Sequence, residues 1–134
     1  MRQRLQQAGL AERIELDSAG TGGWHVGKAP DSRTQQAASR RGYDLSSLRG
    51  RQVSVDDFAR FDLILAMDSA NLRDLQRIRP ANARAELDLY LRRFELAEDE
   101  VPDPYYGGSE GFEHVLDLLE QASDALLIEL KGRL

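Results

Sequence analysis

Apolar and polar residues recur along this chain with two different periods, and the pattern predicts an order of strands and helices. The clearest strand is the near-continuous apolar run Phe61–Met67, which is typical of a parallel strand buried on both faces. The longest helix begins at Ser109, after which apolar residues recur every three or four positions through Leu130. Together they favour an α/β fold.

Shorter patterns predict the remaining elements. They are a helix over Met1–Ala8 closed by Gly9, a strand over Arg13–Ser18, a helix over Asp31–Arg41 closed by Gly42, a brief helix from Ser54 through Phe58, a helix from Asp68 and Ser69 that stops before Pro80, and a strand over Glu86–Leu91. The first helix has no capping residue before it, so it resembles the tail of a longer helix.

Strands and helices alternate in this order, which implies a three-layer α/β sandwich, a parallel sheet with helices on both faces. The chain contains no repeat, low-complexity tract or long linker, so we expect residues 1–134 to form a single domain. In such sheets the site lies beyond the carboxyl ends of the strands. The segments predicted to meet there are Asp17–Thr21, Met67–Ser69 and Val101–Gly108.

Composition narrows the possible chemistry. The 134 residues carry a net charge of −5, which argues against a nucleic-acid partner. No apolar run has the length of a membrane span and no charged-then-apolar leader opens the chain, so we expect a cytoplasmic protein without a membrane partner. The sequence has no cysteine, which excludes thiolate catalysis, Cys-ligated zinc and iron–sulfur clusters within these residues.

Asp103 is the strongest candidate for chemistry. Pro102 and Pro104 flank it and bias its backbone to an extended form, and Tyr105 and Tyr106 follow with flat apolar walls. A general acid beside an aromatic rim needs this kind of arrangement. A rigid turn with solvated tyrosines has the same spacing, so the pattern alone leaves both interpretations open.

Other polar and aromatic residues near the same end of the sheet are also ambiguous. Trp24, on a glycine-rich loop, either lines a pocket or pins its loop to the body of the protein. His25 and His114 have no second histidine or thiol near them in sequence, so we expect no metal site. Two arginine pairs either steer an anion or are solvated helix ends: Arg40 with Arg41, and Arg49 with Arg51.

Seven stretches taken together resemble the low-molecular-weight protein tyrosine phosphatases. They are Asp17-Ser-Ala-Gly-Thr, Trp24-His-Val-Gly, Pro30-Asp-Ser-Arg33, Arg51-Gln-Val, Phe61-Asp-Leu-Ile-Leu-Ala-Met-Asp68, Asn71-Leu-Arg-Asp-Leu75 and Asp103-Pro-Tyr-Tyr-Gly107. They follow one another over essentially the whole chain, and the last is the most diagnostic. The resemblance implies hydrolysis of a phosphotyrosine protein or a small aryl phosphate through a cysteinyl-phosphate, without a cofactor.

The resemblance also implies roles for five residues. Asp103 matches the general acid that protonates the leaving phenolate and later activates water. Tyr105 and Tyr106 match tyrosines at the rim of the site, and Trp24 matches an aromatic residue beside the pocket that shapes substrate choice. Ser18 matches a serine that hydrogen-bonds the phosphate-binding loop and helps to hold it.

The sequence departs from the family pattern in two places. Leu48 stands where a histidine often supports the surroundings of Asp68. The family also begins with a strand that leads into a Cys-x5-Arg phosphate loop, and these residues contain no such segment. We therefore expect that roughly fifteen to twenty residues, including a central strand, are missing before Met1. The chain alone should then be inactive and could self-associate through exposed sheet edges.

Three interpretations of the function remain. The first is a tyrosine phosphatase whose amino-terminal segment was lost through gene annotation, rearrangement or truncation. The second is a non-catalytic relative, a binding or interaction module that uses the rim formed by Trp24, Tyr105 and Tyr106. The third is an arsenate reductase on the same scaffold, which also depends on cysteines. The DNA upstream of the Met1 codon distinguishes the first interpretation from the second.

Overall fold

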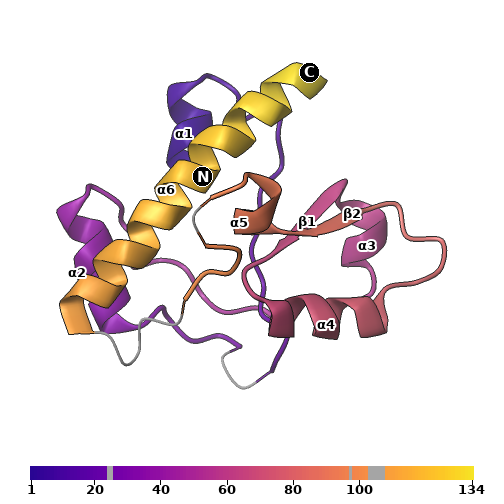
Figure 1. Ribbon diagram of the computed structural model, residues 1–134, viewed down its shortest axis with the longest axis horizontal. Helices are drawn as coiled ribbons and strands as arrows, with labels where there is room; N and C mark the ends of the chain where they lie inside the picture. Colours follow the sequence, from indigo (N-terminus) through magenta and orange to yellow (C-terminus); the bar gives the residue numbers. More distant parts are fainter. Residues whose placement is uncertain (24–25, 97, 103–107) are drawn as a thin grey trace.

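A computed structural model of the chain describes residues 1–23, 26–96, 98–102 and 108–134, with side chains in the last segment from 111 onward (Figure 1). Along these residues the elements follow in the order α1 (Arg2–Gln7), α2 (Ser32–Arg40), α3 (Asp57–Arg60), β1 (Leu63–Ala66), α4 (Ser69–Ile78), β2 (Glu86–Leu89), α5 (Tyr90–Arg93) and α6 (Gly108–Arg133).

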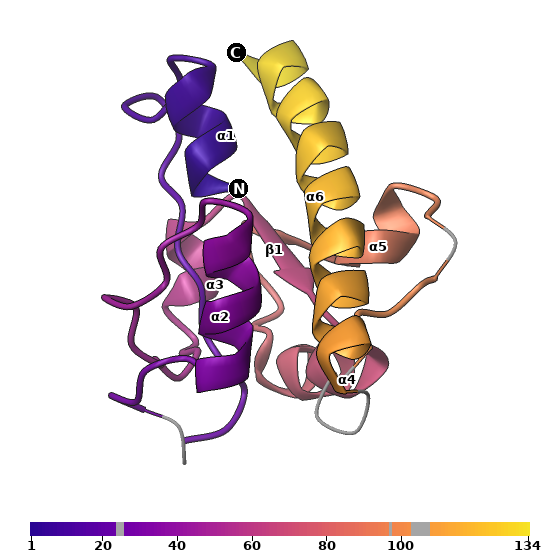
Figure 2. The ribbon, with the colours of Figure 1, turned by 90° about the vertical axis from the view of Figure 1, so that its left-hand side faces the viewer.

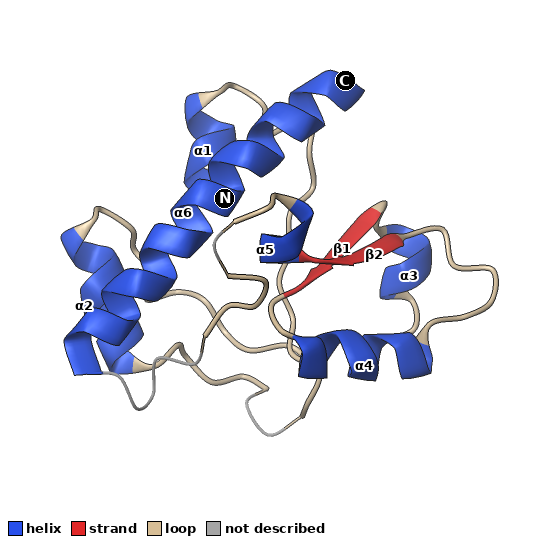
Figure 3. Cartoon of the chain, viewed as in Figure 1, coloured by secondary structure: helices blue, strands red, loops and turns tan. Residues whose placement is uncertain are grey.

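A pair of parallel strands forms the middle layer of the fold (Figure 3). β1 pairs with β2 in a register that runs from Leu63 opposite Glu86 to Ala66 opposite Leu89. The chain crosses between them through α4, as a parallel connection requires. α3 and α4 lie on one side of the strands, whereas α6 lies on the other with α1 and α2 beside it (Figures 1 and 2). The predicted α/β class, with a parallel sheet and helices on both faces, is therefore confirmed.

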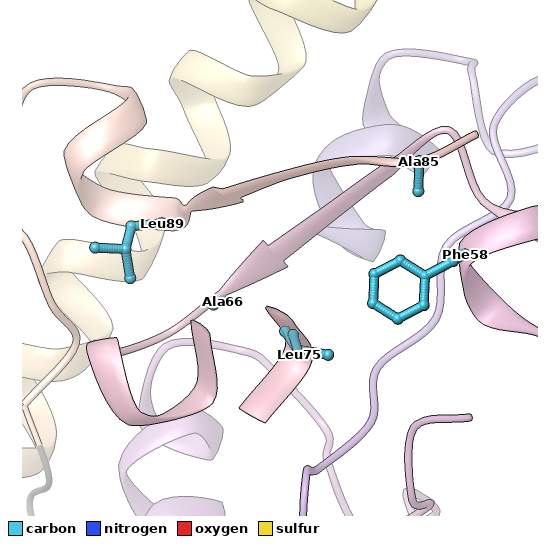
Figure 4. Packing of buried hydrophobic residues seen from close by; sticks show 5 residues of the cluster. All are labelled: Phe58, Ala66, Leu75, Ala85 and Leu89. Atoms are coloured by element: carbon cyan, nitrogen blue, oxygen red, sulfur yellow. The ribbon is translucent and has the colours of Figure 1, made fainter. Parts of the chain in front are cut away.

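The face of the sheet toward α3 and α4 is packed with apolar side chains that range in size from alanine to phenylalanine. Phe58, Ala66, Leu75, Ala85 and Leu89 form one buried cluster there. Figure 4 shows Phe58 on α3 and Leu75 on α4 beside the two strands that carry Ala66 and Leu89. Phe58 is fully buried. Burial of these side chains, at about 25 cal/mol per Å² of apolar surface, fixes α3 and α4 on this face.

The opposite face of the sheet packs against α6. A second cluster contains Tyr90, Leu91, Leu118, Ala122 and Leu126, with alternate residues of the β1 region packed against it. Because successive strand side chains point to opposite faces, one short apolar strand contributes to both clusters. This explains why the strand reads as a continuous apolar run instead of an alternating one.

Local capping signals place two of the helices as predicted. The Asp31 side chain accepts a hydrogen bond from the Arg33 N–H at 2.8 Å and begins α2. Asp68 accepts one from the Asn71 N–H at 2.7 Å and begins α4. After α2 the chain turns at Gly42, whose φ of 86° is the left-handed conformation that favours glycine.

Two predicted strands differ from the structure. Arg13–Ser18 is not a strand: the chain turns at its start and is then irregular, and an isolated parallel bridge forms beyond it, between Gly20 and Gln52. A segment forms a β-strand only when a neighbouring strand supplies its hydrogen-bond partners, and no strand of the described residues pairs with this one. The strand predicted over Glu86–Leu91 ends at Leu89. Tyr90 and the residue after it are both buried against α6, which consecutive residues of a strand could not be.

Smaller differences concern the ends of elements. The helix predicted from Ser54 through Phe58 is α3, over Asp57–Arg60. α6 begins at Gly108, so Ser109 lies inside its first turn instead of before it. None of the described helices combines the length and the apolar character that a membrane crossing requires.

Candidate functional site

The carboxyl end of β1 is where the segment leading to Asp103 meets the sheet. The Val101 N–H donates a hydrogen bond to the Met67 carbonyl at 2.7 Å. The Glu100 carboxylate accepts one from the Ser69 N–H at 2.5 Å, at the first turn of α4. That backbone hydrogen bond lowers the pKa of Glu100. Asp103 follows Val101 by two residues, so the chain enters the predicted acid loop at this edge of the sheet.

A side-chain contact attaches the same segment to α6. The His114 Nε2 lies 3.0 Å from the Glu98 Oε1, and both side chains are exposed. The chain before the predicted acid loop is thus joined to α6 by this pair and to α4 by Glu100.

Ser18 lies in an exposed, irregular segment after α1, which we call the Ser18 turn. Its N–H donates to the Asp17 Oδ1 at 2.8 Å. Two residues later the Gly20 N–H donates to the Arg51 carbonyl at 2.7 Å, and the Gly20 carbonyl accepts from the Val53 N–H at 2.8 Å. These backbone bonds hold the turn against the segment that precedes α3.

Arg51 connects this turn to α3 through its side chain. Its Nη1 donates to the Asp57 Oδ2 at 3.0 Å, and its Nε lies 3.3 Å from the Asp17 Oδ2. The Asp57 side chain is only 8% exposed, and it also accepts the Ser54 N–H at 2.8 Å. Burial raises the pKa of Asp57, but the hydrogen bonds from Ser54 and Arg51 outweigh it and leave the pKa below its ordinary value.

The other arginines singled out from the sequence are engaged within the protein. Arg41 pairs with three carboxylates of α6, those of Glu113, Asp117 and Glu120. Arg40 lies 3.4 Å from Glu113, and Arg49 donates to backbone carbonyls. Their contacts favour a role in packing α2 on α6 and in local turns over the steering of an anion.

A hollow of about 320 Å³ lies between the glycine-rich loop and the second half of α4. It is lined by Thr21, Gly22, Gln52, Val53, Asp74, Arg77 and Ile78. The motif Arg51-Gln-Val contributes two of these residues, although sequence reasoning did not connect it with α4. In the described part of the chain, no cluster of three or more acidic, histidine or cysteine side chains could hold a metal ion.

Ser18 is the only one of the predicted site residues that the described residues include. The others lie outside them: Trp24, Asp103, Tyr105 and Tyr106. Their roles therefore stay predictions. Sequence reasoning missed the contacts of Arg51, Asp57 and Glu100. The only sequence signal for Asp57 is its spacing from Ser54, and no signal connects Glu100 with α4, because that contact spans 31 residues.

Comparisons with known proteins give a consistent result. The model of the family "Low molecular weight phosphotyrosine protein phosphatase" matches residues 1–133. A low molecular weight protein-tyrosine-phosphatase of Streptomyces coelicolor is 42% identical over 134 residues, covering 97% of this chain and 81% of that relative. A crystal structure of a protein tyrosine phosphatase from Entamoeba histolytica superposes with a TM-score of 0.90 at 38% identity, covering 99% of this chain and 86% of that one. A low molecular weight phosphotyrosine phosphatase from Vibrio cholerae gives a TM-score of 0.88 at 36% identity, covering 98% of this chain and 84% of that one.

Proposed function

Because the chain belongs to the low molecular weight phosphotyrosine protein phosphatase family, we propose that its residues supply the general acid, the substrate rim and the loop support of a phosphotyrosine hydrolase. In this proposal Asp103 is the general acid, while Trp24, Tyr105 and Tyr106 contact the aryl phosphate. Ser18 supports the phosphate-binding loop. The substrate is a phosphotyrosine protein or a small aryl phosphate, and no cofactor takes part.

The proposed reaction has two steps. A cysteine thiolate attacks phosphorus, so that an S–P bond forms and the P–O bond to the aryl group breaks, while the Asp103 carboxyl gives its proton to the leaving phenolate. Water then attacks the cysteinyl-phosphate, Asp103 takes a proton from that water, and inorganic phosphate leaves as the thiolate is regenerated. Because the 134 residues contain no cysteine, the nucleophile of this reaction is not among them.

The observation that supports this proposal most is the match of the family model to residues 1–133, a span that includes every proposed site residue. The contacts at the carboxyl end of β1 are consistent with it. Val101 and Glu100 hold the chain against this edge two and three residues before Asp103. In parallel α/β sheets, this edge is where ligands bind.

We further propose that the 134 residues alone do not hydrolyse phosphate esters. A carboxylic acid has no phosphoryl transfer to assist without a nucleophile. The missing parts in this view are a strand, a Cys-x5-Arg loop and the start of a helix, encoded upstream of the Met1 codon. An in-frame strand and Cys-x5-Arg motif in that DNA is the expected result, whereas stop codons or unrelated sequence would contradict it.

The test compares two proteins with p-nitrophenyl phosphate as substrate. One is the 134-residue chain, and the other carries a family-typical strand, Cys-x5-Arg loop and helix start before Met1; we call it the restored protein. We expect no turnover above background from the first and turnover from the second that Cys→Ser in the added loop abolishes. Turnover by the 134-residue chain that Asp103→Asn removes would contradict the proposed inactivity.

The absence of cysteine from the sequence also supports a second candidate. It is a non-catalytic binding or interaction module that uses the same rim of Trp24, Tyr105 and Tyr106. This module would bind a phosphotyrosine peptide in the 134-residue chain, and the restored protein would gain no turnover. Activity in the restored protein together with an upstream Cys-x5-Arg segment favours the enzyme.

A further inference from the structure

The backbone of the turn that carries Ser18 is attached to the segment 51–53. It makes two short hydrogen bonds there, from the Gly20 N–H to the Arg51 carbonyl and from the Val53 N–H to the Gly20 carbonyl. These bonds fix the position of Gly20. They leave the orientation of residues 17 and 18, which precede it on the exposed side, to side-chain contacts.

The side-chain contacts form a continuous chain from α3 to Ser18. Asp57, which is buried at the start of α3, accepts a hydrogen bond from the Arg51 Nη1 at 3.0 Å. The Nε of the same guanidinium lies 3.3 Å from the Asp17 Oδ2. The other oxygen of Asp17 accepts the Ser18 N–H at 2.8 Å. The Arg51–Asp57 and Asp17–Ser18 links are hydrogen bonds to a carboxylate. The Arg51–Asp17 link is an ion pair without hydrogen-bond geometry.

The chemistry of this chain requires arginine at position 51. A planar guanidinium presents several N–H donors in a fixed fork, so it can contact two carboxylates in different directions. A lysine ammonium is a single point charge and would have to choose between Asp57 and Asp17. The Ser18 hydroxyl, at the far end, has no hydrogen-bond partner within the described residues. It is therefore available to a group outside them.

We propose that Arg51 is a positioning residue, which acts through Asp17 to set the orientation of the Ser18 turn toward the phosphate-binding loop. This inference rests on the proposed function, because the support of that loop is the role assigned to Ser18. In this proposal Arg51 contacts neither substrate nor nucleophile and acts only through Asp17. Its effect on turnover depends on the presence of the Ser18 hydroxyl.

The first experiment is hydrogen–deuterium exchange of the restored protein, followed by mass spectrometry of peptides that cover residues 14–23. Arg51→Gln and Arg51→Lys should both speed exchange there by up to about fivefold, the loss expected for a partly exposed ion pair. Arg84→Gln is the matched control, because it removes an exposed pair with Asp62 away from the turn. Unchanged exchange in both Arg51 variants would overturn the inference, whether or not the restored protein is active.

The second experiment is a double-mutant cycle on kcat in the restored protein. Ser18→Ala and Arg51→Gln should each lower kcat by about tenfold with a smaller change in KM, since one preorganising contact is worth about 1.4 kcal/mol. The double variant should be no slower than Ser18→Ala alone. Effects that multiply would overturn the inference, because a purely structural contribution of Arg51 would act independently of Ser18. A restored protein without turnover would instead count against the proposed function, and the exchange experiment would still decide the inference.

Discussion

Individual carboxylate side chains stabilise the irregular segments of this fold. They do so because they accept hydrogen bonds from backbone N–H groups that have no partner within a helix or strand. Asp31 and Asp68 do so at the first turns of α2 and α4. Asp57 does so before α3, and Glu100 does so from a distant segment. The contacts of Asp31, Asp68 and Glu100 satisfy donors that would otherwise be left without a partner at a helix start, and Asp57 satisfies one in the segment before α3. The same residue type thus serves structure here, while chemistry is proposed for Asp103.

The sharpest residue-scale prediction concerns Asp103. In the restored protein, Asp103→Ala should slow turnover by roughly 10²- to 10⁴-fold, the loss expected for a general acid. Phosphate binding should change little, because the loop amides and arginine that bind phosphate are untouched. The measurements are kcat with p-nitrophenyl phosphate and the inhibition constant of inorganic phosphate. Equal turnover with Ala at position 103 would show that Asp103 is not the acid.

A second residue-scale prediction follows from the lowered pKa of Glu100, whose cause is the Ser69 N–H. A carboxylate with a lowered pKa in the folded state stabilises the fold above its ordinary range, and this contribution is lost as the pH falls through the lowered value. Glu100→Gln should therefore lower the urea midpoint of the restored protein near neutral pH. The difference should shrink as the pH falls below the ordinary glutamate value of about 4.3.

The control for this prediction is Glu95→Gln, at a position outside the contacts of α4. Its urea midpoint should follow that of the parent protein at every pH. A difference between Glu100→Gln and the parent that stays constant from neutral to acidic pH would contradict the assigned cause.

At the scale of elements, α1 and α2 are attached to α6 by ion pairs, and these three helices lie on the opposite side of the fold from α4 (Figure 1). Arg4 contacts Glu120 and Asp124, and Arg41 reaches three carboxylates of the same helix. α2 buries little apolar surface against the rest of the fold, because two alanines, Ala37 and Ala38, are its only fully buried residues. Its attachment therefore depends strongly on these charged contacts.

Arg41→Gln tests that dependence. The Arg41 side chain is 23% exposed, and the variant should lower the free energy of unfolding by about 1–3 kcal/mol through the loss of charge-assisted hydrogen bonds. Arg40→Gln is the neighbouring control, because its side chain is 59% exposed and such pairs contribute at most about 1 kcal/mol. Urea unfolding of the restored protein measures both. Equal effects of the two variants would mean that the ion pairs do not attach α2.

At the scale of the whole molecule, the described residues form a two-stranded sheet with one open edge on β1. β1 pairs with β2 along one edge, and no other described strand pairs with its second edge. Leu63, Ile64 and Leu65 are only partly buried although the strand lies between two helical layers. An unpaired apolar edge of this kind favours pairing with another chain.

We therefore predict that the 134-residue chain is unstable or self-associates when it is made alone. A further strand would add on the order of five to ten hydrogen bonds at about 1 kcal/mol each, which is comparable with a domain's stability of about 5–15 kcal/mol. Size-exclusion chromatography at several concentrations should detect oligomers or aggregates. The restored protein should be monomeric and unfold cooperatively. A monomeric 134-residue chain with a cooperative transition at ordinary mesophilic temperature would refute the prediction.

The sequence by itself determined the type and limits of elements whose signals are local. Asp31 and Gly42 delimit α2, and the apolar run around β1 indicates a strand covered on both faces, because caps and periodicity depend on residues close in the chain. The resemblance, carried by motifs spread along the chain, also identified the family that the comparisons show.

Only the tertiary structure decided features that depend on distant partners. Arg13–Ser18 has strand periodicity but forms no ladder, since pairing requires a neighbour that no local pattern supplies. Tyr90 begins a helix because α6 buries it together with the residue that follows. The connection from Asp57 through Arg51 to Asp17 arises because the chain folds back on itself, which brings together charges that lie up to 40 positions apart and that the sequence pattern treats as separate solvated residues.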